Sequence, residues 1–458
     1  MKKKSVDMLC GSVMGGFLSL TIPIMIMNVA QILFNVIDMR ILKVFGYENA
    51  TGAVGATGTL MALSTSLVIG IAAGANVVVA RHIGAKERER AESAIITSLL
   101  FSVFAGIVLM IVGVIFARDF LMMTNCAQSL LDDATKYFQI YFYGIPIQLA
   151  YNFCSSVLRA LGDTKRPMYF LLLGGACKVV FTVLLLLMFE AAVESVAIAT
   201  IISNLVAFVL SFITLLGKKD MVTLSRKKIC FDMTELKAML YNGIPSGFQS
   251  ALYSFANVII VSTVNGFGAA ATTGIAIANQ FDGILYQIAL APHYAVIPYV
   301  AQNMGAGNFK RTKKAIYSAM LITVAFGATL GSLSAIFSHE LSYLLHSSAE
   351  IVEFSSQKMI IVSSTYFICG INEVVGGALK GLGKPISSAV TSLIFLCALR
   401  FLWVYFIFPL CPNLTFLYAV WPVGWTLSII TLLPLLCFAY KKAAKNFDLK
   451  QNVFEKAS

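Results

Sequence analysis

Long runs of apolar residues, separated by short polar segments, dominate the chain from residue 14 to residue 440. A helix that crosses a bilayer needs about 20 apolar residues. The pattern therefore predicts an all-α polytopic membrane protein with twelve transmembrane helices. We expect these spans at residues 14–42, 51–80, 92–117, 134–159, 167–189, 192–216, 238–265, 271–301, 312–337, 355–379, 387–409 and 414–440.

The longest polar stretch lies near the middle of the chain, at residues 217–235. We interpret it as a cytoplasmic linker between two lobes of six helices, an N-terminal lobe at 1–216 and a C-terminal lobe at 236–440. Residues 441–458 then form a cytoplasmic tail.

The two halves repeat each other at a nearly constant offset along the chain. Five motifs of the first half recur in the second half in the same order, and their offsets agree to within one position. They are Ile22-Pro23 with Ile244-Pro245, Asn35-Val36-Ile37 with Asn257-Val258-Ile259, Phe45-Gly46 with Phe267-Gly268, Gly84-Ala85 with Gly305-Ala306, and Arg159-Ala160-Leu161-Gly162 with Lys380-Gly381-Leu382-Gly383. Because each half contains an even number of spans, both insert with the same orientation. A parallel internal repeat of this kind predicts a substrate path between the lobes.

The composition excludes the other broad classes. Hydrophobic residues make up 58% of the chain and charged residues 12%, against about 45–50% and about 25% in soluble proteins. A soluble globule would need a more highly charged surface. A disordered chain would be polar and rich in charge.

The net charge of +12 follows membrane topology and does not indicate a nucleic-acid-binding surface. Of the 34 Lys and Arg residues, 27 lie in the termini and in alternate loops, which is the positive-inside pattern. The intervening loops carry Arg40, Lys43, Arg118, Lys136 and Lys358. The pattern predicts that both termini lie in the cytoplasm, which requires an even number of spans.

Neither disulfides nor enzymatic chemistry is indicated. The nine cysteines lie mostly in apolar runs and form no CxxC motif, which argues against a disulfide framework. Nucleotide-binding, serine-hydrolase and zinc-protease motifs are missing from the sequence. We therefore predict a protein that is not an enzyme and carries no cofactor. The first apolar run contains Pro23 and has no clear cleavage site, so we interpret it as a retained span.

We expect five charged residues at lipid depth within the predicted spans. They are Asp38, Lys178, Asp282, Glu373 and Arg400. A charge at the bilayer centre costs about 2.5–3.5 kcal/mol even on translocon scales. We expect these side chains to face the protein interior or an aqueous cavity, although Asp38 or Arg400 near a span end has the alternative of reaching the interface.

A polar stripe accompanies Asp38 on the first span. Gln31, Asn35 and Asp38 are spaced so that they share one helix face. Pro23 frees a backbone carbonyl in the same helix and allows it to bend. The stripe indicates a functional surface, and the alternative is hydrogen bonding between helices.

The second half contains a comparable set of polar residues. Asn279, Asp282 and Tyr286 share a face of the eighth span, Gln249 and Asn257 share a face of the seventh, and Glu373 lies on the tenth among small residues. A carboxylate among amide and hydroxyl oxygens suits Na⁺, and burial also favours the protonated acid. We predict H⁺ or Na⁺ at Asp282 or Glu373. The alternative for each acid is an ion pair with Lys178 or Arg400.

These residues resemble the multidrug and toxic compound extrusion (MATE) family, bacterial type, within the multidrug/oligosaccharidyl-lipid/polysaccharide exporter superfamily. The resemblance covers about residues 14–440 and depends on motifs that are loose singly and specific together. They are Asn35-Val36-Ile37-Asp38, Ala80-Arg81-His82-Ile83-Gly84-Ala85-Lys86 with Ala301-Gln302-Asn303-Met304-Gly305-Ala306-Gly307, Leu158 through Pro167, Gly243-Ile244-Pro245-Ser246 through Asn257, Asn372-Glu373-Val374, and Leu399-Arg400-Phe401-Leu402-Trp403.

The resemblance implies a two-lobe exporter in the bacterial plasma membrane that exchanges organic cations for H⁺ or Na⁺. Asp38 matches a first-span acid that couples transport to a cation in the family, and Asp282 and Glu373 match acids of the C-terminal lobe. Lys178, Gln31, Asn35, Gln249, Asn257, Asn279, Tyr286 and Arg400 are the supporting polar residues. A single duplicated chain can form the whole pathway, so we expect a monomer in contact with lipid.

One departure from the family pattern concerns the fifth span. Lys178 and Thr182 stand where many members carry Asn and Asp. A lysine beside Asp38 would replace the coupling cation with a fixed ion pair. We therefore hypothesise that coupling depends mainly on Asp282 and Glu373, and that the Asp38–Lys178 pair is structural or gating. Transport that is lost in Asp38→Asn but kept in Glu373→Gln would contradict this hypothesis.

Two other functions fit parts of the sequence. A flippase or exporter of a lipid-linked or other amphipathic substrate would need an excess of basic cavity residues. The two intramembrane bases counted against three acids favour cationic substrates. A scaffold or receptor without transport is disfavoured by the duplicated halves and the interior charges.

Overall fold

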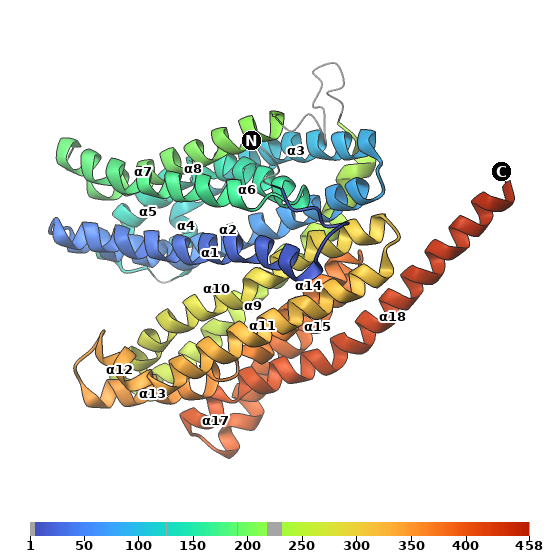
Figure 1. Ribbon diagram of the computed structural model, residues 1–458. Helices are drawn as coiled ribbons and strands as arrows, with labels where there is room; N and C mark the ends of the chain where they lie inside the picture. The colour runs from blue at the N-terminus through green and yellow to red at the C-terminus, as the bar shows by residue number, and fades with distance from the viewer. Residues whose placement is uncertain (1–4, 125, 190, 218–230, 458) are drawn as a thin grey trace. The chain divides into compact units, whose positions relative to one another are not determined.

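The computed structural model describes residues 5–124, 126–189, 191–217 and 231–457. Within these ranges every regular element is a helix (Figure 1). Ten of the described helices are long and apolar enough to cross a membrane, and one bent pair raises the number to eleven. The prediction of an all-α membrane protein with two lobes is therefore confirmed.

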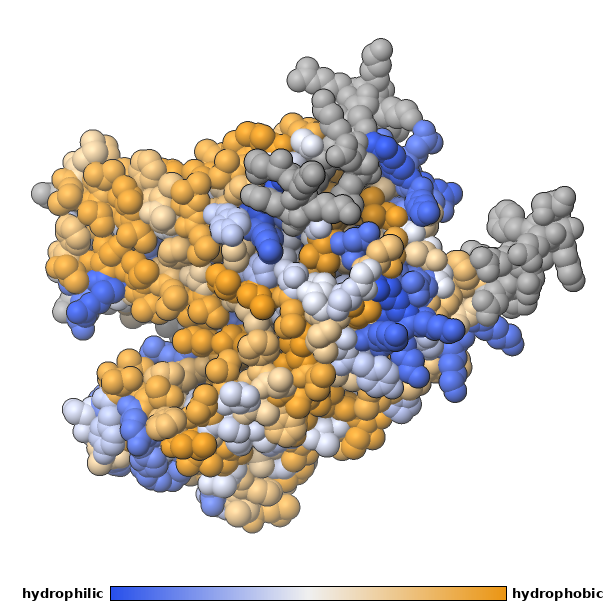
Figure 2. Space-filling model, viewed as in Figure 1, coloured by the Kyte–Doolittle hydropathy of each residue, from blue (hydrophilic) through white to orange (hydrophobic). Residues whose placement is uncertain are grey.

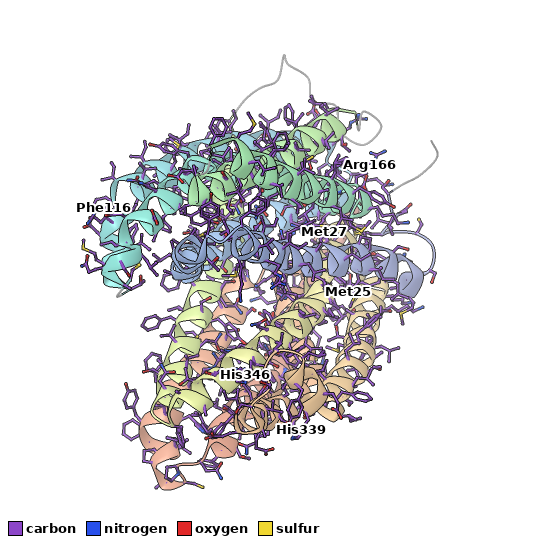
Figure 3. The ribbon with its side chains drawn as sticks, turned by 90° about the vertical axis from the view of Figure 1, so that its left-hand side faces the viewer. Met25, Met27, Phe116, Arg166, His339 and His346 are labelled. Atoms are coloured by element: carbon purple, nitrogen blue, oxygen red, sulfur yellow. The ribbon has the colours of Figure 1, made fainter. Side chains whose placement is uncertain are left out.

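The chain forms two compact units, each described here by itself. Unit 1 comprises residues 1–6 and 26–244, and unit 2 comprises residues 7–25 and 245–458. The division falls inside two long helices, α1 (Val13–Val44) and α9 (Met233–Asn265), and not in the expected linker. Met25 and Met27 lie in α1 on either side of it (Figure 3). Pro23 and Pro245 lie at or near the division, where each removes a helical hydrogen bond.

Unit 1 contains the second to sixth predicted spans. Its remaining helices are α2 (Glu48–Gly84), α3 (Arg88–Ile115), α4 (Ala117–Met123), α5 (Gln128–Tyr143), α6 (Ile145–Ala160), α7 (Lys165–Phe189) and α8 (Ala192–Leu216). The fourth predicted span is broken into α5 and α6 at Gly144, which caps both helices. Phe116 and Arg166 lie at opposite ends of this unit (Figure 3).

Unit 2 repeats this order of elements. Its helices are α10 (Ala269–Gly305), α11 (Phe309–Ile336), α12 (Ser338–Tyr343), α13 (Ala349–Ser363), α14 (Tyr366–Gly381), α15 (Pro385–Ser392), η2 (Leu393–Ala398), α16 (Leu399–Leu402), η3 (Trp403–Ile407), η4 (Phe408–Leu410), α17 (Leu414–Tyr418) and α18 (Val420–Ala457). The tenth predicted span is the pair α13–α14, bent by 46°. His339 lies in the short α12, and His346 follows it (Figure 3).

Some sequence predictions fall on residues outside the description. These are the basic residues Lys2, Lys3 and Lys4 and the segment 218–230 of the expected linker. At the other end of the chain, α18 continues from the twelfth predicted span through the residues that we expected as a tail, as far as Ala457.

The turns of the two units share an unusual backbone conformation. Gly162 and Gly383 both have positive φ, at 79° and 75°. Lys86 has φ 61° where its partner in the second half, Gly307, has φ 68°. Positive φ is natural for glycine and strained for lysine. The duplication found in the sequence therefore extends to the backbone of its loops.

Close helix packing explains two GxxxG motifs in the sequence, Gly70/Gly74 and Gly327/Gly331. A Cβ added at Gly74 would overlap the carbonyl oxygen of Met239 in α9, and one at Gly331 would overlap the carbonyl oxygen of Ser363 in α13. Small residues allow this approach between helix backbones.

Large apolar side chains lie on the outside of both units. Phe104 is 67% exposed in unit 1 and Phe406 is 71% exposed in unit 2. Hydrophobic residues cover much of the molecular surface in the drawn view (Figure 2). An apolar exterior of this extent requires a lipid environment.

Candidate functional site

In unit 1 the structure brings Asp38 and Lys178 together. Asp38 of α1 and Lys178 of α7 form an ion pair, with side chains 6% and 10% exposed. Asp38 Oδ1 and Thr182 Oγ1 have no hydrogen-bond partner among the described residues. Gln31 and Asn35 of the same helix are exposed, whereas Asp38 is buried. The ion pair expected from the sequence is therefore present.

Unit 2 contains a second ion pair, between Asp282 of α10 and Lys358 of α13. Asp282 Oδ2 lies 2.7 Å from Lys358 Nζ, and the two side chains are 9% and 2% exposed. Lys358 also donates to Asn279 Oδ1, and Ser363 Oγ donates to Asp282 Oδ1 at 3.1 Å. Our assignment of Lys358 to a loop is wrong. Because α13 is the first half of the broken tenth span, it carries this lysine into the interior of the unit.

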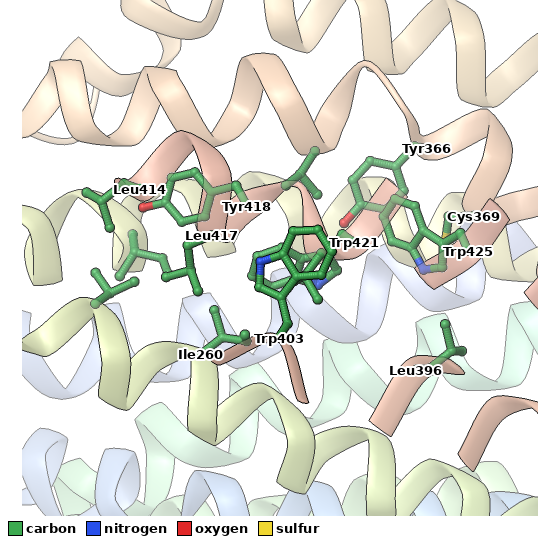
Figure 4. Close-up of a cluster of buried hydrophobic side chains, with 14 of the residues drawn as sticks. Ile260, Tyr366, Cys369, Leu396, Trp403, Leu414, Leu417, Tyr418, Trp421 and Trp425 are labelled. Atoms are coloured by element: carbon green, nitrogen blue, oxygen red, sulfur yellow. The ribbon is translucent and has the colours of Figure 1, made fainter. Parts of the chain in front are cut away.

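An aromatic cluster surrounds the basic groups of unit 2. Trp421 belongs to a buried group that includes Tyr366, Trp403, Tyr418 and Trp425 (Figure 4). The Lys358 ammonium and the Arg400 guanidinium each lie 5.5 Å from the centre of the Trp421 ring. Cation–π contacts of this kind stabilise a buried positive charge.

Arg400 contacts the polar face of α9 that we predicted from Gln249 and Asn257. Its Nη1 donates to Asn257 Oδ1 at 2.7 Å, and its guanidinium lies 4.6 Å from the centre of the Tyr253 ring. Gln249 Nε2 donates to Ser392 Oγ at 2.7 Å on the same pair of spans. The π-helical segments η2 and η3 flank Arg400, and π-bulges frequently occur at functional sites.

Arg400 and Lys178 occupy equivalent positions of the repeat but have different partners. Each faces the first helix of its own half, α9 or α1. The counterpart of Asp38 in the second half is Ile260, which is buried. Arg400 therefore contacts an amide where Lys178 contacts a carboxylate.

Glu373 differs from the other two acids. Its Oε2 lies 3.4 Å from His293 Nδ1, which also contacts the Glu373 backbone oxygen at 2.7 Å. Among the described residues, no Lys or Arg lies within ion-pair distance of the Glu373 carboxylate. Tyr286, nearby on α10, stacks on Tyr253 with ring centres 6.0 Å apart.

The number of buried basic residues within the spans differs from the number that we counted in the sequence. Lys358 raises the intramembrane bases to three, with Lys178 and Arg400, against the three acids. Our count of two bases is therefore wrong, and its preference for cationic substrates loses its support. A lysine inside the predicted span 355–379 was the available signal. The described residues contain no group of three or more His, Cys, Asp or Glu arranged to hold a metal ion.

The comparisons with known proteins agree with the duplication. The family model MatE matches residues 23–184 and again residues 245–406, so the second match begins and ends at one and the same offset from the first. One relative is a probable multidrug resistance protein, YoeA of Bacillus subtilis, 26% identical over 379 residues that cover 81% of this chain and 82% of the relative. Another is an FAD transporter of Shewanella oneidensis, 23% identical over 82% of this chain and 84% of the relative.

A solved structure shares the fold. It is the outward-facing conformation of a multidrug resistance MATE family transporter, with a TM-score of 0.89 and 20% identity over 97% of this chain and 100% of that chain. Because the two matches to the family model cover most of the sequence, the chain belongs to the MatE family of multidrug and toxic compound extrusion transporters.

Proposed function

We propose that this protein is an antiporter that exports organic cations by alternating access and couples their export to H⁺ or Na⁺, with Glu373 as the principal coupling acid. The observation that carries the proposal is the difference between the three intramembrane acids. Asp38 and Asp282 are each paired with a lysine, whereas the described partner of the Glu373 carboxylate is His293.

The reason is electrostatic. A carboxylate beside a fixed ammonium is already neutralised, so it gains little from a proton or Na⁺. A carboxylate without a fixed counter-charge gains the most from binding a cation, and a mobile cation is what an antiporter must exchange. Glu373 comes nearest to this condition, because Lys380 of the same helix acts on it electrostatically but lies beyond ion-pair distance. Asp38 and Asp282, each in direct contact with a lysine, then have structural or gating roles.

The setting of Glu373 suits a cationic substrate. Tyr286 and Tyr253 form a stacked aromatic pair in the same unit, and aromatic faces attract organic cations. A cationic substrate and the coupling ion then compete for negative charge at one acid, so binding of one releases the other. The relative YoeA is named a multidrug resistance protein, in agreement with such a substrate.

The experiment is uptake of ethidium into proteoliposomes that contain the purified protein. A pH gradient is imposed in one set and a Na⁺ gradient in the other. We expect one gradient to drive accumulation and Glu373→Gln to abolish it. The matched control is Glu353→Gln, because Glu353 is exposed and contacts a histidine, His339. Accumulation that survives in Glu373→Gln, or falls equally in the control, would refute the role of Glu373.

A second candidate is export of an amphipathic anion or a lipid-linked substrate. Arg400 favours it, because this buried guanidinium contacts Asn257 and aromatic rings but no carboxylate within ion-pair distance among the described residues. The FAD transporter relative carries an anionic molecule. Gradient-driven uptake of FAD, absent for ethidium and lost in Arg400→Gln, would favour this candidate.

We further propose that the protein works as a monomer in the plasma membrane with both termini in the cytoplasm. The apolar exterior supports a membrane location, and the loop charges support the orientation. A single cysteine introduced at the C-terminus, in a variant whose nine native cysteines are replaced by serine, is labelled in intact cells to test the orientation. Labelling by a membrane-impermeant reagent would refute it.

A further inference from the structure

The surroundings of the Lys358 ammonium match those of a bound ligand. A carboxylate oxygen of Asp282 lies 2.7 Å away, the amide oxygen of Asn279 accepts a hydrogen bond, and the Trp421 ring centre lies 5.5 Å away. A carboxylate, a neutral oxygen acceptor and an aromatic face are the three groups that recognise an organic ammonium in proteins. Here the ammonium belongs to the protein itself.

We propose that Asp282, Asn279 and Trp421 form a binding site for a primary alkylammonium group, and that the Lys358 side chain fills this site as a tethered ligand. An incoming ammonium compound binds by displacing Lys358. This inference goes beyond the coupling role of Glu373 and concerns unit 2 alone.

The supporting groups hold the site in shape without Lys358. Ser363 Oγ donates to the second carboxylate oxygen of Asp282 at 3.1 Å, and the Tyr366 hydroxyl donates to the Asp282 backbone oxygen at 3.2 Å. Trp421 is packed in the buried aromatic cluster (Figure 4). Asp282 and Trp421 are therefore each fixed by neighbours other than the lysine.

The positions of the contacts also define an approach. Asn279 is an exposed residue, whereas the Asp282 side chain is 9% exposed and the Lys358 side chain 2%. The site is thus reached from the Asn279 side of α10, and the lysine enters from α13. A substrate from that side meets the amide first and the carboxylate second.

The duplication does not account for this arrangement. At the offsets of the neighbouring repeat motifs, 222 and 221, the first-half counterpart of Asp282 is Leu60 and that of Lys358 is Tyr137, which follows the exposed Lys136. The first unit has its own pair, Asp38 with Lys178, at other positions. A carboxylate at the Asp282 position is therefore a feature of unit 2 and not of both halves.

The test removes the tethered ammonium and supplies a free one. Lys358→Ala deletes the atoms from Cγ to Nζ, and n-propylammonium replaces them atom for atom. Thermal unfolding of the purified full chain in detergent is followed at increasing n-propylammonium chloride, with n-propanol and NaCl at equal concentrations as controls. A ligand that binds the folded state raises the midpoint in a saturable way.

We expect n-propylammonium to raise the midpoint of Lys358→Ala saturably. Its Kd for this variant should be at least about tenfold lower than for the unsubstituted protein, because the tethered lysine competes there at high effective concentration. The double variant Lys358→Ala/Asp282→Asn should show no shift. Lys313→Ala is the matched control, since Lys313 lies over an aromatic ring of the same unit, that of Tyr317, outside the site.

Three results would overturn the proposal. They are an equal shift with n-propanol, an equal shift in Lys313→Ala, and a shift that persists without the Asp282 carboxylate. If Lys358→Ala does not fold, it is purified in n-propylammonium chloride or in n-propanol at the same concentration. Recovery of monodisperse protein with the amine alone supports the site, and failure with both refutes it. Because the assay uses no ion gradient, its failure leaves the antiport proposal intact.

Discussion

Breaking the Asp282–Lys358 ion pair is the most direct perturbation of the interior of unit 2. Lys358→Met keeps the length and volume of the side chain and removes its charge. Because the two side chains are 9% and 2% exposed, the carboxylate left behind is buried and retains Ser363 as its described side-chain partner. Loss of one member of such a buried pair costs about 3–5 kcal/mol.

The same physics sets the expected cost of the double variant. Asp282→Asn/Lys358→Met removes both charges, so no uncompensated charge remains, and replacing a whole buried pair is often neutral. We therefore expect the free energy of unfolding of the double variant to lie within about 1 kcal/mol of that of the unsubstituted protein. The two changes then couple by several kcal/mol in a double-mutant cycle.

The assay is unfolding of the detergent-solubilised protein by titration with SDS, followed by circular dichroism. Arg118 and Asp132 form the matched control pair, because they are 3.0 Å apart but 56% and 77% exposed. Arg118→Met should cost less than about 1 kcal/mol. A loss of less than about 1 kcal/mol in Lys358→Met, or a double variant whose loss equals the sum of the single losses, would refute the reasoning.

Three further predictions concern the ends and contacts of helices. Lys86→Gly should stabilise the protein by about 0.5–1 kcal/mol, because it removes the backbone strain at a φ of 61° and this gain exceeds the entropic cost of ordering a glycine. Lys86→Ala keeps the strain and should not stabilise the protein. Thermal unfolding measures both variants. Gly74→Leu should prevent folding, because its side chain would overlap the Met239 carbonyl of α9, and the yield of monodisperse protein measures this. The backbone N–H of Thr234 holds the pKa of the Asp232 carboxyl below its ordinary value of 3.8. The stabilisation from Asp232 is then complete above about pH 4 and is lost as the pH falls through the lowered pKa. The difference in unfolding midpoint between Asp232→Ala and the unsubstituted protein should therefore become smaller in acid. A larger difference in acid would contradict this prediction.

The sequence by itself determined the class, the spans and the duplication. Apolar runs of sufficient length have one stable arrangement in lipid, since every backbone polar group must be bonded within its own helix. The predicted and observed spans therefore agree closely, and the sixth, 192–216, is the same in both. The constant offset between the halves depends on residue identity alone and needs no coordinates.

The sequence also predicted one of the two ion pairs, through its resemblance to the family. The resemblance placed Lys178 of the fifth span beside Asp38 of the first, and an unpaired charge within a span is costly. The polar stripe on α9 was likewise recognisable from its spacing, and its members Gln249 and Asn257 do face one partner span. Periodicity indicates which residues share one face of a helix, but it does not indicate which other helix packs against that face.

Only the tertiary structure decided how the remaining charges are partnered. Lys358 reaches Asp282 because α13 packs against α10 and because the tenth span is bent by 46°, which places the lysine in the interior. The two residues lie on different spans, far apart in the sequence, and no pattern along the chain encodes their pairing. Whether a buried carboxylate has a fixed counter-charge depends on a few ångströms between helices, so the distinction between Asp282 and Glu373 lies in the packing and not in the sequence pattern.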